Sequence, residues 1–294
     1  MKKKILILYL LSFVLASAFG QKAELNVLTK SEEKSVSTQK IKRIEINTER
    51  TDIIVKTWNE NKIKLEIEYI SKHALKTTAE KELSYLNMLG DASGGTYYVK
   101  SLIKLGTDGK QPQASLSFRL IITLPGNIPL KIKNKLGKVD IENSSLSSII
   151  LELELCHLSV SNSNLKGKIL QKFGECQIEN SSFEGTLQLT RTLSRLEFIK
   201  GIWTVISESG RIHLVPPADN LLLKLTANKT EIEIMGKFIE KQHIKVKGDR
   251  TVIDISDKLK TKNEANGIIS LGSKKSTGGI DIQNVLGSVR VYSY

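Results

Sequence analysis

Hydrophobic and polar residues alternate along most of this chain, with the period of two that predicts β-strands. Between Val139 and Leu214 this alternation forms a motif that recurs five times. The motif Val139-Asp140-Ile141-Glu142-Asn143-Ser144-Ser145-Leu146 returns from Leu158, from Cys176 and, more loosely, from Leu196 and Ile212. The starts are 19, 18, 20 and 16 residues apart. A repeat of about 20 residues predicts a stack of β-coils.

Each of the first three repeats ends its strand with an asparagine on the same face as the apolar pair. In the first repeat, Val139 and Ile141 share that face with Asn143. An inward polar side chain is costly unless it is hydrogen-bonded. Coils stacked about 4.8 Å apart would allow the amides to bond to one another. We therefore predict a structural ladder of inward amides, formed by Asn143, Asn162 and Asn180.

One large apolar residue follows each repeat start by seven positions. These residues are Leu146, Leu165, Phe183 and Trp203. Their recurrence predicts a column in the core, so Trp203 is interpreted as a core residue and not as a platform for a sugar ring. Glycines between the repeats mark the turns.

The pattern divides the chain into four segments. Residues 1–20 are interpreted as a secretory signal peptide, because a basic start, an apolar run and small residues follow one another. Residues 21–38 are polar and predict a flexible lead-in. Residues 39–124 predict a β-rich N-terminal module with a helix at 72–89, and residues 125–294 predict the β-solenoid repeats. The predicted fold class is therefore all-β, with coils of about 19 residues.

The helix prediction for 72–89 depends on an apolar stripe between two end signals. Ser71 would serve as the N-cap and Gly90 would terminate the helix. The stripe consists of Leu75, Ala79, Leu83 and Leu86. Upstream, the bend at 58–61 is expected to join two strands as a hairpin.

The charge of the chain indicates anionic partners. The formal net charge is +13, which becomes +10 without the three lysines of the predicted signal peptide. A basic surface on an exported protein favours partners such as acidic polysaccharides or other anionic envelope components. Aromatic residues make up only 5% of the chain. This disfavours nucleic acid, which is usually bound by basic residues interleaved with exposed aromatics.

Two cysteines, Cys156 and Cys176, raise the question of a disulfide in an oxidising compartment. The repeat alignment places them one coil apart and two residues out of step. This offset predicts a Cα separation of about 8 Å, whereas bridged cysteines rarely exceed about 7 Å. We predict two buried free thiols.

No catalytic, cofactor-binding or metal-binding set emerges from the sequence. The four histidines, His73, His157, His213 and His243, are far apart and lack a second ligand at metal spacing. Asp140, Glu142 and Glu179 lie on the outward faces, at a spacing loosely compatible with glycoside hydrolysis. Their surroundings are typical of an ordinary solvated face, so we expect no enzyme, no cofactor and no metal.

Several motifs resemble the putative-adhesin domain family of unknown function, which is common in exported proteins of Bacteroidetes-type bacteria. They are the strand Ile44-Glu45-Ile46-Asn47, the turn Trp58-Asn59 with Val55 before it, a helix with Ala79 and Glu80, and the stretch Leu120–Pro125. The chain departs from the family where Asn-Ser-Ser corners replace many of the repeat glycines. The resemblance implies an all-β, solenoid-like exported protein and supplies no catalytic residues.

The sequence as a whole predicts an exported, non-enzymatic binding or adhesin-like scaffold at the bacterial cell envelope, located in the periplasm, on the cell surface or outside the cell. The expected partner is an anionic glycan or another envelope component, without nucleic acid and without a transmembrane segment. Two alternatives stay open: a carbohydrate-active enzyme built on a β-solenoid, and a structural or regulatory envelope protein.

Overall fold

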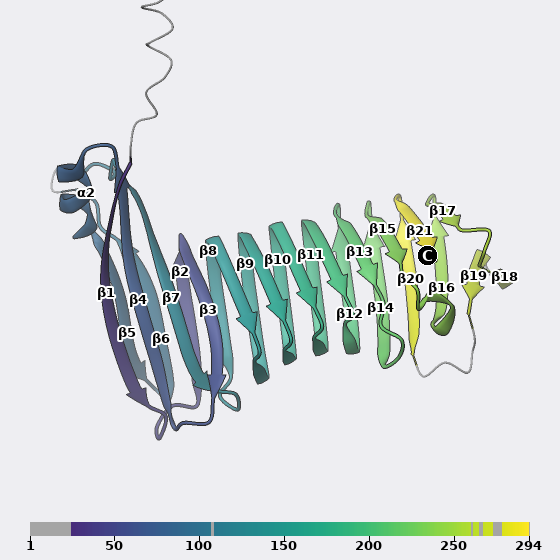
Figure 1. Cartoon of the computed structure of the whole chain (residues 1–294), viewed down its shortest axis with the longest axis horizontal. Coiled ribbons are helices and arrows are strands. Elements are labelled where there is room, and N and C mark those ends of the chain that lie inside the picture. Colours follow the sequence, from purple (N-terminus) through teal and green to yellow (C-terminus); the bar gives the residue numbers. More distant parts are fainter. Residues whose placement is uncertain (1–24, 107–108, 260, 265–266, 273–277, 294) are drawn as a thin grey trace, which may run out of the picture.

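The computed structural model describes residues 25–106, 109–259, 261–264, 267–272 and 278–293. Within these residues the chain is mostly β-strand, with one short α-helix and a large mixed sheet (Figure 1). The predicted signal peptide, 1–20, lies outside the described residues.

The strands form two layers that enclose the core, and the long strands β8–β11 bend from one layer into the other. The first layer begins with β5 (Leu86–Ser93), β6 (Thr96–Ile103) and β2 (Arg43–Glu49). It continues through the first halves of β8 (Leu130–Glu142), β9 (Ser145–Ser161), β10 (Asn164–Glu179) and β11 (Ser182–Glu197). It ends with β12 (Lys200–Glu208), β14 (Leu221–Asn228), β20 (Gly279–Val285), β16 (His243–Asp249), β19 (Ile268–Leu271) and β18 (Thr261–Glu264). The second layer begins with β1 (Asn26–Ser37), β4 (Lys62–His73), β7 (Ser115–Pro125) and β3 (Thr51–Trp58). It continues through the second halves of β8–β11 and ends with β13 (Arg211–Val215), β15 (Glu231–Met235), β21 (Ser288–Tyr292) and β17 (Val252–Ile255). Among the described residues, the helical elements are α2 (Lys76–Leu83) and the 3₁₀ turn η1 (Ile239–Lys241).

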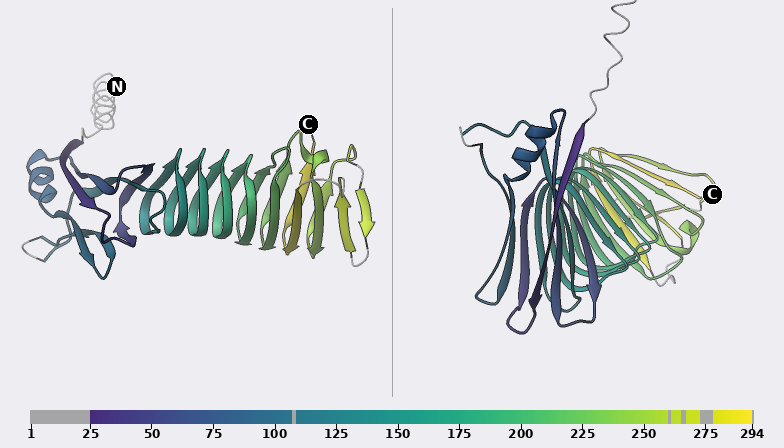
Figure 2. Two further views of the ribbon diagram at one scale, coloured as in Figure 1. Left: turned by 90° about the horizontal axis from the view of Figure 1, so that it is seen from below. Right: turned by 60° about the vertical axis from the view of Figure 1, so that its left-hand side comes forward.

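Successive coils pair in parallel from β8 to β15 (Figure 2). The register shifts by one residue between β9 and β10, where Leu165 pairs with Leu146 and Gly167 pairs with Ile149. In the fourth repeat, Cys176 pairs with Ser194 and not with Leu196. The true repeat starts are therefore Val139, Leu158, Cys176, Ser194 and Ile212, which are 19, 18, 18 and 18 residues apart. The apparent irregularity in the sequence arises because Ser194 is polar although it is buried.

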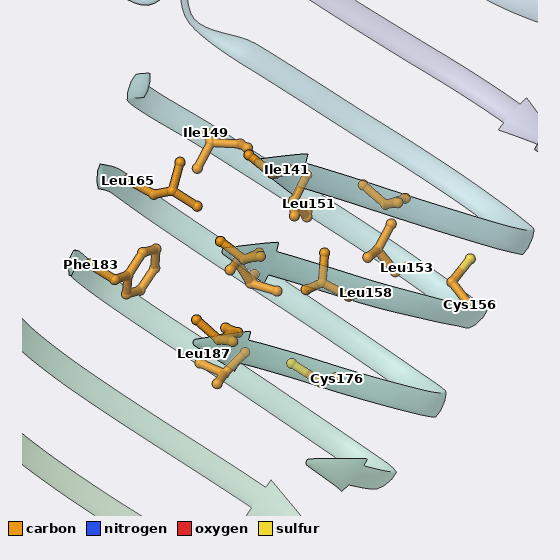
Figure 3. Packing of buried hydrophobic residues seen from close by; sticks show 14 of the residues in the cluster. Ile141, Ile149, Leu151, Leu153, Cys156, Leu158, Leu165, Cys176, Phe183 and Leu187 are labelled. Atoms are coloured by element: carbon orange, nitrogen blue, oxygen red, sulfur yellow. The ribbon is translucent and has the colours of Figure 1, made fainter. Parts of the chain in front are cut away.

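The predicted core column consists of two neighbouring columns. Leu146, Leu165 and Phe183 pair with one another in neighbouring coils and are buried. Leu165 and Phe183 lie side by side in Figure 3. Trp203 is also buried, but it pairs with Gly185, while Phe183 pairs with Gly201. Because neither glycine has a side chain, the indole has room beside the Phe183 ring, and the two ring centroids are 4.7 Å apart.

The coils turn at left-handed residues, with positive φ, at both ends of the two layers. Examples are Asn143 at φ 49° and Leu155 at φ 53°. The residue after the left-handed residue is buried in most coils, and it usually carries a short hydrogen-bonding group or no side chain. The Ser144 hydroxyl donates to the Glu142 carbonyl at 3.0 Å, and the Cys156 thiol donates to the Glu154 carbonyl at 3.3 Å.

The predicted helix at 72–89 is wrong in its extent. Strand β4 continues through Ser71, which is buried and therefore is not the N-cap. The helix α2 covers only Lys76–Leu83, and β5 begins at Leu86. The apolar stripe of the predicted helix does not form one helix face, because Leu75 is 62% exposed and Leu86 is buried as part of a strand.

The lead-in predicted as flexible is also corrected, because β1 pairs antiparallel with β4 along its whole length. Its sequence is rich in charge because it is an edge strand, and charge on an edge limits aggregation. Residues 21–24 lie outside the described part of the chain. The expected hairpin at 58–61 does not form either, since β7 lies between β3 and β4.

The last coil of the sequence does not occupy the end of the stack. Strands β20 and β21 lie between the coil β14–β15 and the coil β16–β17 (Figure 1). Strands β18 and β19 then cover the end of the first layer.

Candidate functional site

The three repeat asparagines do not form the predicted inward ladder. Asn143, Asn162 and Asn180 are all exposed, at φ 49°, 48° and 47°. A left-handed residue reverses the alternation of the strand, so the inward position passes to the next residue. The prediction failed because it extended the period-two pattern through the corner.

Serines form the internal ladder in place of the asparagines. Ser144, Ser163 and Ser181 are buried. The backbone N–H of Ser144 donates to the Ser163 Oγ at 3.1 Å, and the N–H of Ser163 donates to the Ser181 Oγ at 3.1 Å. Each serine hydroxyl in turn donates a hydrogen bond to the backbone carbonyl of the residue two positions earlier in the sequence. The serine that follows each asparagine in the sequence was the signal for this ladder.

The exposed row on this side of the stack, which we call the asparagine edge, consists of Asn143, Asn162, Asn180 and Phe198. All four are left-handed, and each backbone N–H donates to a carbonyl of the next coil, at 2.8–3.3 Å. In the described part of the chain, none of the three amides has a side-chain hydrogen bond. About 4.8 Å separates neighbouring coils, so three amides span about 10 Å.

A groove of about 850 Å³ runs along the asparagine edge. Its floor consists of the three asparagines and the serines beside them, and Phe198, Pro217 and Phe238 line one end. Lys237 and Lys241 place their amines 5.0 and 5.3 Å from the centre of the Phe238 ring. The aromatic end of the groove is therefore also cationic.

A second groove, of about 1010 Å³, lies next to the first and shares Ser145, Asn164 and Ser182 with it. The Trp58 turn lines it. The Trp58 indole N–H donates to the Lys62 carbonyl at 2.9 Å, and the Lys62 amine lies 5.2 Å from the ring centre. The two grooves together give the asparagine edge a broad polar surface with aromatic groups at both ends.

The outward histidines lie next to carboxylates on the second layer. His157 Nδ1 lies 3.1 Å from Glu175, and His213 Nδ1 lies 3.3 Å from Glu233. Burial raises the pKa of Asp140 from its usual value, although His157 and Lys138 oppose this. In the described residues, no three His, Cys, Asp or Glu side chains are placed to hold a metal ion.

Both cysteines are free and buried. Cys156 pairs with Gly174, and Cys176 pairs with Leu158, which is the offset of two residues that the repeats predicted. Burial raises the pKa of Cys156 to about 11 and that of Cys176 to about 12. Both thiols are therefore poor nucleophiles at neutral pH.

Known proteins resemble this chain in structure but not in sequence. A comparison with models of protein families gives no match, and neither does a search of curated proteins. Among solved structures, a putative adhesin from Bacteroides fragilis matches with a TM-score of 0.37 and 13% identity, over 90% of this chain and 97% of that one. A putative cell adhesion protein from Clostridium sporogenes matches with a TM-score of 0.33 and 13% identity, over 91% and 100%. A putative adhesin from Parabacteroides distasonis matches with a TM-score of 0.30 and 12% identity, over 90% and 97%.

These neighbours are described in the same terms as the family that the sequence motifs resemble. Among the described helices, none has the length and apolar character needed to cross a lipid bilayer.

Proposed function

We propose that this chain is an exported, non-enzymatic binding scaffold of the bacterial cell envelope that holds a glycan along the asparagine edge. In this proposal residues 125–294 form a β-solenoid, residues 39–124 form a β-rich N-terminal module whose strands β2 and β3 pair with β8, and residues 1–20 direct export. The scaffold would be adhesin-like, in the periplasm, on the cell surface or outside the cell.

The observation that carries the proposal is the row of three exposed amides in a groove. An amide offers two N–H donors and a carbonyl acceptor, which matches the paired donors and acceptors of sugar hydroxyls. A concave site with a few convergent polar groups and aromatic walls is the usual form of a ligand site. Phe198 and Phe238 provide apolar surface for the C–H face of a sugar ring.

Charge at the aromatic end favours an acidic glycan. Lys200 and Asp219 both line the groove. Lys237 and Lys241 add two positive charges at the Phe238 ring. The resulting excess of positive charge attracts carboxylate, sulfate or phosphate groups on the sugar chain.

The test uses the mature chain on an array of envelope polysaccharides, followed by titration calorimetry with the best binder. In the variant Asn143→Gly, Asn162→Gly, Asn180→Gly the left-handed backbone is retained, because glycine adopts it readily. Losing three amide contacts of about 1 kcal/mol each should weaken binding at least about tenfold. Lys229→Gly, at a left-handed position on the opposite edge, is the matched control and should bind like the unmodified chain.

Two results would contradict the proposal. The triple glycine variant could bind every glycan as tightly as the unmodified chain. Alternatively, the polysaccharide could be shortened during the titration, which would support the carbohydrate-active enzyme and would be checked with Glu142→Gln and Glu179→Gln.

A further inference from the structure

The edge opposite the asparagine edge carries a different set of exposed side chains. We call it the basic–apolar edge, and it follows the stack through nine left-handed residues, one in each coil: Arg50, Leu136, Leu155, Phe173, Arg191, Ser209, Lys229, Leu286 and Arg250. Four of these are cationic, four are apolar and one is serine. In this described row, no position is acidic.

Apolar side chains are energetically unfavourable at these left-handed positions. Leu136, Leu155 and Phe173 have φ values of 60°, 53° and 57°, and they are 37%, 47% and 36% exposed. A left-handed conformation costs an ordinary L-residue about 1–2 kcal/mol, and asparagine tolerates it better. The same coils use asparagine for the same conformation at the other edge. Folding alone therefore does not account for the large apolar side chains here.

Positive charge surrounds these apolar residues. Lys138, Lys172 and Arg191 have no carboxylate within ion-pair distance among the described residues. The Arg191 guanidinium lies 5.8 Å from the centre of the Phe173 ring. Leu193, two residues further on, is 57% exposed and adds to the apolar surface.

Asp140 lies close enough to Lys138 to interact with its charge, and three other acidic residues near these coils are already engaged. Glu154 pairs with Lys135 at 3.3 Å, and Glu175 pairs with His157 at 3.1 Å. Asp52 accepts a hydrogen bond from the Lys138 backbone N–H at 2.9 Å. The other nearby carboxylates, Glu49, Glu208 and Asp249, flank the edge towards its two ends. The patch is therefore centred on the coils of β8–β11.

We propose that the basic–apolar edge docks on an anionic lipid surface. Leu136, Leu155 and Phe173 would enter the boundary between head groups and acyl chains, while Lys138, Lys172 and Arg191 would lie near the lipid phosphates. Apolar burial and attraction to anionic lipid act together in peripheral binding, and each lysine or arginine near such a surface contributes about 1 kcal/mol. This surface goes beyond the proposed glycan groove and is independent of it.

The experiment is co-sedimentation of the mature chain with vesicles of phosphatidylcholine, with and without phosphatidylglycerol. We expect binding only to vesicles that contain phosphatidylglycerol, and weaker binding at high salt. The variant Leu155→Asn, Phe173→Asn should bind at least about tenfold less, because two buried apolar side chains are lost. Since asparagine suits the left-handed backbone, the same variant should unfold at an equal or higher temperature.

Phe198→Asn is the matched control, because Phe198 has the same backbone conformation, at φ 50°, on the asparagine edge. It should retain vesicle binding, and the vesicles contain no glycan, so this test is separate from that of the groove. Equal binding to both vesicle types would overturn the proposal, and so would full vesicle binding by the Leu155→Asn, Phe173→Asn variant. Capture of soluble dextran sulfate that is unaffected by these two substitutions, without vesicle binding, would identify a polyanion site instead.

Discussion

The two edges of the stack share one backbone design and differ in the side chains placed on it. At the asparagine edge, Asn143, Asn162 and Asn180 have φ values of 47–49°. At the basic–apolar edge, Leu155 and Phe173 have φ values of 53° and 57°. Amides therefore face a groove on one side, while leucine and phenylalanine face solvent among unpaired cations on the other.

This difference shows that the side chain of the left-handed residue does not determine the backbone conformation of the corner. The corner conformation depends on the parallel register and on the residue after the corner. This residue either donates a hydroxyl or thiol hydrogen bond to the carbonyl two residues earlier, or is a glycine that lets neighbouring coils approach closely. The corner side chain points outward and is free to serve binding. Four substitutions test this division between corner and inward residues, and the most disruptive of them comes first.

Gly174→Ala should disrupt the basic–apolar edge most strongly. Gly174 follows Phe173 at φ 100°, and a Cβ there would lie 2.1 Å from the Cys156 carbonyl oxygen. Because the obstacle is backbone of the neighbouring coil, we expect the free energy of unfolding to fall by about 3 kcal/mol, measured by urea denaturation. Gly94→Ala is the control, since a Cβ added at Gly94 would meet no atom within 4 Å. Equal losses in the two variants would show that the close coil contact is unimportant.

Ser163→Ala tests the equivalent inward residue at the asparagine edge. It removes one hydroxyl and leaves the Ser144 backbone N–H without the acceptor that it has at 3.1 Å. A buried donor that loses its partner costs about 1–3 kcal/mol, so we expect a loss of about 2 kcal/mol by the same denaturation assay. Ser145→Ala, at the exposed position directly after Ser144 in the previous coil, should change stability by less than about 0.5 kcal/mol. If Ser163→Ala left the free energy of unfolding unchanged, the serine ladder would not stabilise the fold.

The two thiols should make stability fall at high pH. Burial raises the pKa of Cys176 from 9.0 to about 12. The unfolded thiol therefore ionises first, and stabilisation that is complete below about pH 9 is lost as the pH rises towards about 12. The loss should approach 1.4 kcal/mol per pH unit. Cys176→Ala should flatten the pH dependence in urea titrations under reducing conditions, relative to the unmodified chain. An unchanged slope would contradict burial of this thiol in the folded state.

Asn162→Leu makes one position of the asparagine edge resemble the other edge. The backbone should keep its conformation, but a leucine at φ 48° is less favourable than an asparagine. We expect a loss of about 1 kcal/mol by thermal or chemical unfolding, together with weaker glycan binding. Asn164→Leu, an exposed position in an ordinary strand conformation, is the control for the change in stability. A loss larger than about 3 kcal/mol would mean that the asparagine has a structural role.

The stacking of the chain could be predicted from the sequence because the repeats are nearly identical. The recurrence of Leu146, Leu165 and Phe183 fixed which coils are neighbours, and the structure pairs these residues directly. The fourth repeat was misaligned because Ser194, a buried polar residue, stands where the pattern required an apolar one. Trp203 was then assigned to the wrong column.

The candidate site was only half predictable. The asparagines were identified as a set, but their direction depends on a left-handed φ that strand periodicity does not include. The basic–apolar edge was not predicted at all, because its members come from nine coils and share a backbone angle rather than a residue type. Strands β1 and β5 were missed because charge and glycine obscure the alternation in edge strands.

The decisive measurement is the free energy of unfolding of the variant Leu136→Asn, Leu155→Asn, Phe173→Asn. In this variant both edges carry asparagine at the corners of the same coils. If the corner side chains serve binding and not folding, the variant will be as stable as the unmodified chain, or more stable by about 1 kcal/mol per site, while vesicle binding is lost. A decrease of more than about 2 kcal/mol would show the opposite, because leucine and phenylalanine would then be holding the corners in place.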